Sequence, residues 1–363
     1  MSGFGKYYLG RIKQMRTEEI CLNKERQVTL SAYLQPVGGE FENIVRRPAV
    51  LVLPGGGYQY CSDREAEPVA MEYLRAGYQA FVLRYSLKKN AVWPNPLEDY
   101  EQAMALIREK AEEWNLYPDK IAVVGFSAGG HLAAYAATMS KNRPNAAILG
   151  YPVIVEENAH IWEKTAPDAA KAVDNNTCPC FVFASRDDVL VPVENTLQFT
   201  TALAEHRISF ESHIYAYGPH GFSTADDSIL SPGTRICNRA FRWVSDSLEW
   251  LKDVFGSFAD GQMSEPKCKR RVNGNEDEEY SIDCTLGYLM TQPETSQMMQ
   301  AMMDQAKEMM GQDMSQQAEQ TSSPEQLREI MANMRLRDML GMARLSEDVI
   351  AGIDSKLRQI PKK

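Results

Sequence analysis

The chain is short of long apolar stretches and of positive charge, and each shortage excludes a class of protein. Its longest apolar runs are strand-sized, such as residues 49–53 and 121–124, whereas a membrane span needs about 18 residues. Lys and Arg number 39 against 49 Asp and Glu, so the net charge of −10 repels phosphate backbones and anionic lipid. We therefore expect neither a membrane protein nor a nucleic-acid-binding protein.

Cysteine is also scarce, with seven residues, an odd number, scattered over 363 positions. This pattern is typical of reduced thiols rather than of a disulfide framework. Cys178 and Cys180 flank Pro179, but no second Cys/His pair lies at zinc-finger spacing, so we expect buried thiols and no metal site. The first 15 residues interrupt their few apolar side chains with basic ones and lack the h-region of a secretory signal. A cytoplasmic location is therefore expected.

What is present is an alternation of short apolar runs with helical patterns over about residues 28–255. The clearest helix is predicted over residues 95–114, with Asn95 as N-cap and Pro96 in the first turn. Seven runs rich in Val, Ile and Leu predict strands covered on both faces: 28–34, 49–53, 79–85, 120–125, 146–151, 180–185 and 210–217. The pattern predicts an α/β domain with a mostly parallel sheet flanked by helices.

The composition changes after residue 255. Residues 256–280 carry a basic cluster followed by an acidic one, which predicts a solvated linker. Twelve of the eighteen methionines fall between residues 290 and 342, and helix starts at Ser323 and Ser346 complete a pattern of about three helices. One helical stripe, which we interpret as core packing, consists of Met298, Met299, Met302, Met303, Ala306, Met309 and Met310. We expect a catalytic domain over 1–255, a linker over 256–280 and a small all-α, Met-rich module over 281–363.

The strongest local signal is Gly-Phe-Ser-Ala-Gly-Gly at residues 125–130, between an apolar strand and a helical pattern. It has the Gly-x-Ser-x-Gly pattern in the strand, turn and helix context that exposes a serine hydroxyl at a helix N-terminus. Ser127 is therefore the predicted nucleophile. The alternative is a glycine-rich turn that serves only the geometry between strand and helix.

A glycine run, Leu-Pro-Gly-Gly-Gly-Tyr at residues 53–58, follows an earlier strand. Glycine lets backbone N–H groups turn toward a pocket unobstructed by a side chain, as stabilisation of an oxyanion requires. We expect the donors to be the amides of Gly56, Gly57 and Ala128. A phosphate-binding loop is the alternative, but the glycines match neither G-x-G-x-x-G nor a P-loop.

The general base has to come from five histidines, at positions 131, 160, 206, 213 and 220. In hydrolases with this serine turn the partners follow in the order serine, acid, histidine. His220 lies in a Gly/Pro turn after the last predicted strand and is the favoured base. The acid is expected after the preceding strand, where Asp188 is favoured and Asp187 either holds the loop or faces solvent. The alternative is that both are ordinary carboxylates before a helix.

With these residues in place the chain resembles the α/β-hydrolase superfamily, specifically the esterases with a PGGGY loop. This group includes bacterial acetyl esterases, acetylxylan esterases and related carbohydrate esterases. Pro54 precedes the glycines where lipases of a neighbouring group have histidine. The resemblance covers about residues 20–255 and rests on LPGGGY, WPNPLEDYEQAM, YPDKIAVVGFSAGGHLAA, SRDDVLVPVENT and GPHGFS.

The resemblance implies an α/β-hydrolase fold and an oxyanion hole at the PGGGY loop. Its catalytic triad would be Ser127, Asp188 and His220, and no metal or organic cofactor would be required. The tail from about residue 281 is similar, loosely, to a small helical module found after some bacterial carbohydrate-active enzymes.

The resemblance also implies a small-molecule ester substrate, with acetyl groups removed from oligosaccharides through an acyl enzyme. Tyr58, Trp93 and Trp162 are candidate substrate-binding residues, and an insertion at 155–177 brings Trp162 near the site, although each is equally compatible with packing. Two alternatives stay open. One is a serine peptidase of the prolyl-oligopeptidase type, and the other is a non-catalytic binding or assembly protein. In either case the helical tail can mediate homo-oligomerisation.

Overall fold

The computed structural model describes residues 14–310 and 323–362, and the chain divides into two compact units. The first unit is Met1–Arg270 and the second is Arg271–Lys363. In the described part of the chain, the first unit has three buried apolar clusters and the second unit has one. No helix among these residues is long and apolar enough to cross a membrane.

The boundary between the units falls inside the predicted linker, residues 256–280. Before the boundary, the N–H of Lys267 donates to the carbonyl of Asp253 at 2.8 Å. After it, the N–H of Gly274 donates to the carbonyl of Asp283 at 2.9 Å. Most residues of the predicted solvated linker are exposed, and backbone hydrogen bonds attach its two halves to different units.

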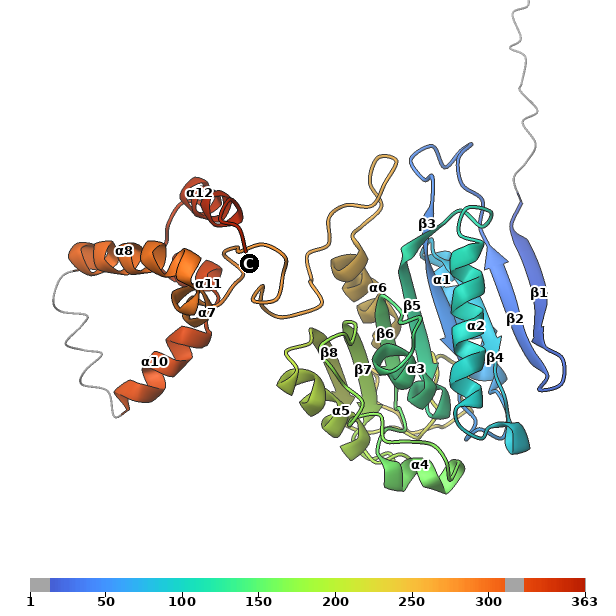
Figure 1. Ribbon diagram of the computed structural model, residues 1–363. Helices are drawn as coiled ribbons and strands as arrows, with labels where there is room; N and C mark the ends of the chain where they lie inside the picture. The colour runs from blue at the N-terminus through green and yellow to red at the C-terminus, as the bar shows by residue number, and fades with distance from the viewer. Residues whose placement is uncertain (1–13, 311–322, 363) are drawn as a thin grey trace, which may run out of the picture. The chain divides into compact units, whose positions relative to one another are not determined.

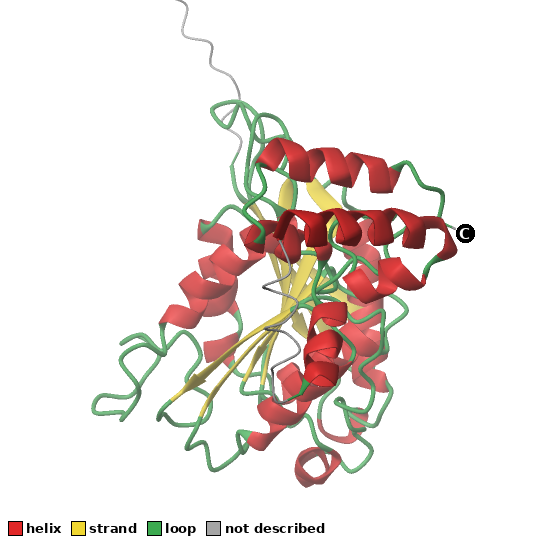
Figure 2. Ribbon diagram, turned by 90° about the vertical axis from the view of Figure 1, so that its left-hand side faces the viewer, coloured by secondary structure: helices red, strands yellow, loops and turns green. Residues whose placement is uncertain are grey.

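The first unit is built on an eight-stranded sheet with the order β1-β2-β4-β3-β5-β6-β7-β8 (Figure 1). The β1–β2 and β2–β4 pairs are antiparallel and the other five pairs are parallel. In Figure 2 the strands fan out, as the twist of such a sheet requires. The strands are β1 Arg16–Asn23, β2 Val28–Leu34, β3 Arg47–Leu53, β4 Gln79–Arg84, β5 Leu116–Phe126, β6 Ala146–Gly150, β7 Cys180–Ser185 and β8 Phe210–Tyr215.

The predicted mostly parallel α/β architecture is confirmed, and the strand that sequence reasoning missed is β1. This strand lies at the edge of the sheet and its residues are exposed or half-buried. An edge strand that faces solvent carries charged side chains and lacks a continuous apolar run, so the pattern used for the other strands did not find it.

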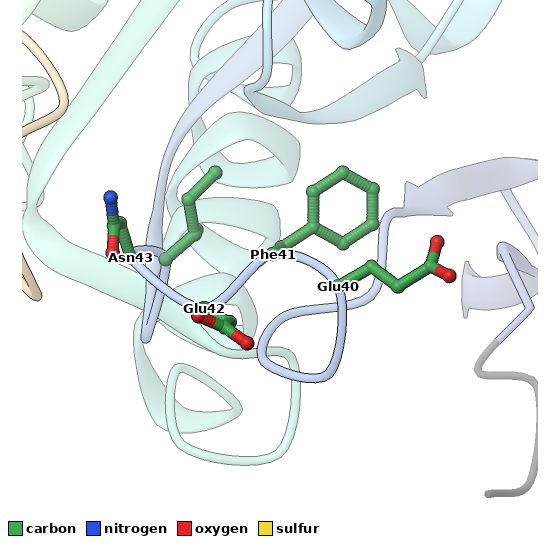
Figure 3. A pocket seen from close by; sticks show the side chains of 5 residues that line it. Glu40, Phe41, Glu42 and Asn43 are labelled. Carbon is green, nitrogen blue, oxygen red and sulfur yellow. The ribbon is translucent and has the colours of Figure 1, made fainter. Parts of the chain in front are cut away.

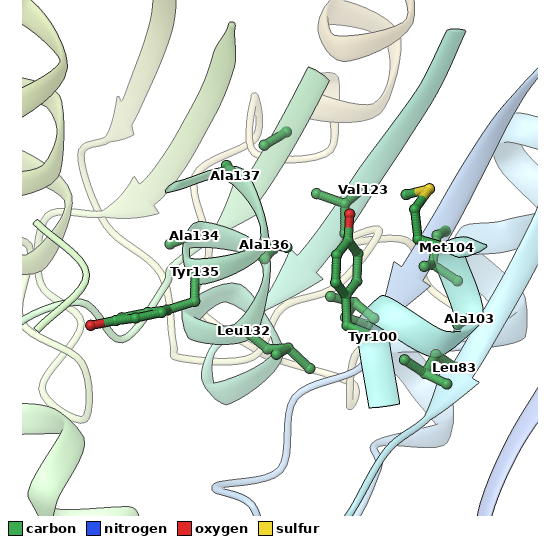
Figure 4. Packing of buried hydrophobic residues seen from close by; sticks show 14 of the residues in the cluster. Leu83, Tyr100, Ala103, Met104, Val123, Leu132, Ala134, Tyr135, Ala136 and Ala137 are labelled. Atoms are coloured by element: carbon green, nitrogen blue, oxygen red, sulfur yellow. The ribbon is translucent and has the colours of Figure 1, made fainter. Parts of the chain in front are cut away.

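Helices cover both faces of the sheet. Residues of α2 (Asn95–Glu109), α3 (Ala128–Thr138) and α5 (Glu194–Glu205) lie in the core on one face. Residues of α1 (Glu67–Arg75) and α6 (Arg242–Phe255) lie in the core on the other face. Figure 4 shows the first of these cores around α2 and α3. Because both faces are covered, strands β3, β4, β6 and β7 are buried along nearly their whole length instead of alternating.

The helix predicted over residues 95–114 is shorter and starts differently. It ends at Glu109, because Trp114 is buried in the core as the chain approaches β5. Its N-cap is Pro94 and not Asn95, whose side-chain amide donates to the carbonyl of Asn90 at 3.0 Å.

The second unit contains five helices in its described residues, where about three were predicted. The short α7 and α11 escaped prediction because six or seven residues show too little periodicity. Of the methionine stripe, Met298, Met299, Met302 and Met303 belong to the core of this unit. The side chains of Ala306, Met309 and Met310 lie outside the described part of the chain. The helices are α7 Leu286–Thr291, α8 Pro293–Met310, α10 Pro324–Asn333, α11 Leu336–Met342 and α12 Glu347–Arg358.

Candidate active site

Ser127 occupies the turn between β5 and α3 and has backbone angles of φ +52° and ψ −116°. Such a conformation costs a non-glycine residue about 1–3 kcal/mol, so its surroundings have to impose it. The Ser127 N–H donates to the carbonyl of Gly150 at 3.0 Å. Its carbonyl accepts from the N–H groups of His131 at 3.0 Å and Val153 at 3.1 Å. The turn thereby holds the hydroxyl at the carboxyl edge of the sheet.

The two glycines of the Gly-x-Ser-x-Gly pattern are required by close approaches of the backbone. A Cβ atom at Gly125 would lie 2.2 Å from the carbonyl oxygen of Gly129. A Cβ atom at Gly129 would lie 2.1 Å from the carbonyl oxygen of Leu53. Helix α3 therefore packs against the ends of β3 and β5 at distances that only glycine permits.

The side chains of Ser127, His220 and Asp188 meet in one chain of hydrogen bonds. Ser127 Oγ lies 2.8 Å from His220 Nε2, and His220 Nδ1 lies 2.7 Å from Asp188 Oδ2. A neutral imidazole in this position donates from Nδ1 to the carboxylate and accepts at Nε2 from the hydroxyl. The three residues follow β5, β8 and β7, whose carboxyl ends lie at the same edge of the parallel sheet.

Asp188 is fixed by the backbone that follows it. Its side chain is buried, and Oδ1 accepts the N–H groups of Leu190 at 2.9 Å and Val191 at 3.0 Å. The other oxygen, Oδ2, is therefore the one left for His220. Of the two adjacent carboxylates, Asp188 is the one in contact with the imidazole.

Asp187 contacts the loop that carries His220 and also faces solvent, so it meets both possibilities that the sequence left open. We call residues 217–223 the histidine loop. Asp187 Oδ1 accepts the N–H of Gly218 at 2.8 Å, and Oδ2 lies 3.1 Å from the guanidinium of Arg235. The Gly218 hydrogen bond, followed by the Arg235 ion pair, lowers the pKa of the Asp187 carboxyl.

The glycine loop, residues 54–58, lies against Ser127. A Cβ atom at Gly55 would lie 3.0 Å from the Cβ of Ser127. The described residues supply no hydrogen-bond acceptor for the amides of Gly56, Gly57 or Ala128. Ala128 opens α3, where the first N–H groups of a helix have no intrahelical partner. These three amides are therefore available to bind an anionic oxygen.

Tyr58, the last residue of the glycine loop, is buried and does not line an open site. It is 1% exposed, and its hydroxyl lies 2.8 Å from Nδ1 of His131. The other ring nitrogen of His131 lies 2.8 Å from the carbonyl oxygen of Pro167 and must donate to it. The expectation that Tyr58 binds substrate is therefore corrected, because its hydroxyl is already satisfied by a buried imidazole.

Trp162 and Trp93 lie close to the glycine loop. A Cβ atom at Gly57 would lie 2.7 Å from the ring of Trp162, which ends α4 (Glu156–Trp162) in the predicted insertion. Trp93 packs edge-on against Tyr58, with ring centroids 6.4 Å apart. Both indole N–H groups are buried and have no partner among the described residues. The two rings thus place unpaired donors near the loop.

Glu65 is a buried carboxyl group that sequence reasoning missed. It is 3% exposed and accepts hydrogen bonds from the N–H of Gly55 at 2.9 Å and the hydroxyl of Tyr151 at 2.6 Å. Burial raises its pKa, against the effect of these two hydrogen bonds. Nothing in the local sequence distinguishes Glu65 from a surface carboxylate, because the residues that bury it are distant along the chain.

The hollow drawn in Figure 3 lies away from this site. It is lined by residues 40–44, which precede β3, whereas the glycine loop follows β3. The hollow is therefore at the opposite end of that strand from Ser127. In the described ranges, no group of three or more His, Cys, Asp or Glu side chains is arranged to hold a metal ion.

Two protein families match parts of the first unit. The family described as BD-FAE matches residues 42–145, which include the glycine loop and Ser127. The family described as prolyl oligopeptidase matches residues 94–257, which include Ser127, Asp188 and His220. Neither match extends into the second unit.

Two individual proteins and one solved structure are also similar to this chain. The chain is 36% identical over 217 residues to endo-1,4-beta-xylanase B of Butyrivibrio fibrisolvens and 32% identical over 198 residues to an acetylxylan esterase of Xylanibacter ruminicola. These matches cover 52% and 48% of the chain but only 34% and 41% of the two relatives. MGS-M1, an alpha/beta hydrolase enzyme from a Medee basin deep-sea metagenome library, is 42% identical to this chain in sequence. Its crystal structure matches this structure with a TM-score of 0.62. That match covers 67% of this chain and 98% of MGS-M1.

Proposed function

The chain belongs to the α/β-hydrolase esterase family, and from this premise we propose that it is a serine carboxylic ester hydrolase that acts through an acyl enzyme. The observation that carries the proposal is the hydrogen-bonded chain of Ser127, His220 and Asp188. It lies beside three amides that have no internal acceptor among the described residues.

In the proposed mechanism, His220 takes the proton of Ser127 as its Oγ attacks the ester carbonyl carbon. Asp188 keeps Nδ1 of the imidazole protonated and stabilises the imidazolium that forms. His220 then protonates the departing alcohol, which leaves an acyl group on Ser127. A water molecule, deprotonated by His220, then attacks the acyl carbon, and His220 returns this proton to Ser127 Oγ as the acid is released.

The oxyanion of each tetrahedral intermediate would be bound by the amides of Gly56, Gly57 and Ala128. Such a donor is typically worth about 3 kcal/mol of transition-state stabilisation, because it points at the developing charge before the reaction begins. The strained backbone of Ser127 contributes by holding its hydroxyl beside these donors.

Within this function we propose acetylated oligosaccharides as the substrate class. The similarity to an acetylxylan esterase supports this choice. The half-buried Trp162 beside Gly57 supports it as well, because the apolar face of an indole can pack against a sugar ring. A cytoplasmic location is part of the same proposal, and it suits seven cysteines that are all free.

Hydrolysis of nitrophenyl acetate and nitrophenyl butyrate by the wild type and by Ser127→Ala tests the proposal. We expect kcat to fall by roughly 10³-fold or more in Ser127→Ala, because the nucleophile is lost. Ser245→Ala, which alters an exposed serine of α6, is the matched control and should keep the wild-type rate. Turnover that does not depend on Ser127 would refute the esterase proposal. Release of acetate from acetylated xylo-oligosaccharides then tests the substrate class.

A serine peptidase is the second candidate, because the prolyl oligopeptidase family matches residues 94–257. A proline-containing peptidyl nitroanilide distinguishes the two activities. Cleavage of this amide with a kcat/KM above that for nitrophenyl acetate would favour the peptidase. If Ser127 supports neither the esterase nor the peptidase activity, the alternative of a binding or assembly protein is favoured.

A further inference from the structure

We infer that Glu65 is a positioning residue that joins the glycine loop to the histidine loop and so keeps the oxyanion donors aligned with His220. This inference rests on the proposed esterase function. Glu65 ends the short helix η1 (Asp63–Glu65) and is buried. It touches no reacting atom in the mechanism above, but it lies between the loops that carry the oxyanion donors and His220.

On one side, Glu65 holds the glycine loop. Its Oε2 accepts the N–H of Gly55 at 2.9 Å. A Cβ atom at Gly55 would lie only 2.6 Å from this oxygen and 3.0 Å from the Cβ of Ser127. The carboxyl group therefore contacts the loop at the residue that precedes Gly56, directly beside Ser127.

On the other side, Glu65 is linked to the histidine loop through Tyr151, the residue after β6. Oε1 accepts the hydroxyl of Tyr151 at 2.6 Å, and the oxygen of this hydroxyl accepts the N–H of Ser223 at 3.0 Å. The ring of Tyr151 packs against that of His220, with centroids 5.0 Å apart. A Cβ atom at Gly221 would lie 3.8 Å from Oε1. Displacement of the carboxyl group would therefore free both loops.

The direction of these hydrogen bonds requires an acceptor at both carboxyl oxygens. The N–H groups of Gly55 and Ser223 can only donate, so Tyr151 accepts from Ser223 and directs its own hydrogen to Glu65. A carboxylate meets both demands, whereas a carboxamide meets one. An apolar side chain of similar volume would hold neither loop by a directed bond and would leave both buried donors without an acceptor.

Titratable and charged groups around Glu65 agree with this assignment. Burial is the largest effect and raises the pKa of Glu65, while the hydrogen bonds from Tyr151 and Gly55 and the charges of His220 and Arg64 oppose this rise. The imidazolium that forms on His220 during acylation is thus a charge that an anionic Glu65 favours.

The variant Glu65→Gln tests the inference, with Glu67→Gln as the matched control. Glu67 is two residues further on, at the start of α1, where it pairs with Arg84 at 2.9 Å outside the site. In Glu65→Gln we expect kcat for nitrophenyl acetate to fall about tenfold or more with KM within about twofold, because misplaced groups slow chemistry more than binding. The rate at which a fluorophosphonate labels Ser127 should fall by the same factor. Glu67→Gln should change neither rate.

Tyr151→Phe provides an independent variant if Glu65→Gln fails to fold, as judged by circular dichroism. It removes the hydroxyl between Glu65 and Ser223, so we expect the same loss of kcat at unchanged KM. In the double variant the two losses should not add, because both changes break one network.

The inference is overturned if Glu65→Gln and Tyr151→Phe both keep kcat and the labelling rate within twofold of the wild type. It is also overturned if KM rises as much as kcat falls, or if Glu67→Gln loses as much as Glu65→Gln. A wild type that is labelled at Ser127 but hydrolyses no ester refutes the esterase proposal alone, and the labelling rates still decide the role of Glu65. A wild type that is not labelled refutes both.

Discussion

His131 follows Ser127 by one turn of α3, yet it is held as a neutral imidazole. It is fully buried, and burial lowers its pKa to about 4. One ring nitrogen donates to the carbonyl of Pro167 and the other accepts from the hydroxyl of Tyr58. The ring thereby connects the glycine loop, at Tyr58, to the insertion that carries Trp162, at Pro167.

The depressed pKa of His131 predicts a loss of stability in acid. The unfolded chain binds a proton near pH 6.5, whereas the folded chain does so only near the pKa of about 4, so the free energy of unfolding should fall as the pH drops between these values. The full contribution of this one group is about 3 kcal/mol. Urea denaturation of the wild type and His131→Gln at several pH values measures it, with the half-exposed His160→Gln as control. Equal pH dependence in wild type and His131→Gln would contradict the prediction.

Among the elements, the loops after the parallel strands β7 and β8 are joined by Asp187. This carboxylate contacts Gly218, two residues before His220, while its neighbour Asp188 contacts His220 itself. The two adjacent carboxylates thus make different contacts, one with the backbone of the histidine loop and one with the imidazole, because their side chains point in different directions. The rigidity of the histidine loop depends on this contact as well as on Glu65.

Removal of the Asp187 carboxylate should therefore slow the proposed reaction without abolishing it. In Asp187→Ala we expect kcat to fall about threefold to tenfold at a nearly constant KM, because the loop bearing His220 is less well held. Glu211→Ala, which removes an exposed carboxylate from β8, is the control and should leave kcat unchanged. Steady-state kinetics on nitrophenyl acetate decide the outcome, and an unaltered kcat in Asp187→Ala would contradict it.

At the scale of the whole molecule, the described core of the first unit contains no residue from beyond Arg270. A protein cut after Arg270 should keep the wild-type kcat and thermal midpoint. All five tryptophans belong to this unit, so their fluorescence follows its unfolding. A cut after residue 255 is the comparison and should lower the midpoint, because it removes the hydrogen bond that Lys267 donates to Asp253. An equal drop in the thermal midpoint of both truncated proteins would show that the second unit stabilises the first.

The same truncated protein tests self-association through the second unit, which stays a prediction. Exposed apolar side chains on its last helices, such as Met342 at 75% and Ile330 at 60%, favour this role. We expect the mass in solution to fall from an oligomer to a monomer after the cut. If the number of subunits per particle is unchanged after the cut, the prediction that the second unit mediates self-association is wrong.

The sequence by itself determined the features that depend on residues close together in the chain. Continuous apolar runs predict inner strands of a sheet covered on both faces, and the glycines at 125 and 129 predict the turn that presents Ser127. The chain order of nucleophile, acid and base singled out the three side chains that the structure brings together. The first two signals are local patterns that follow from strand and turn geometry, whereas the order of the three side chains is one that hydrolases with this serine turn share.

Only the tertiary structure decided which distant groups share the site. Glu65 is 86 residues from Tyr151, and no local pattern indicates that the fold buries the two together. Tyr58 lies next to the predicted oxyanion donors in sequence, but its contact with His131 turns it into the core. Such contacts depend on how strands and helices pack across the whole sheet, because burial and hydrogen-bond partners belong to the assembled fold and not to any single segment.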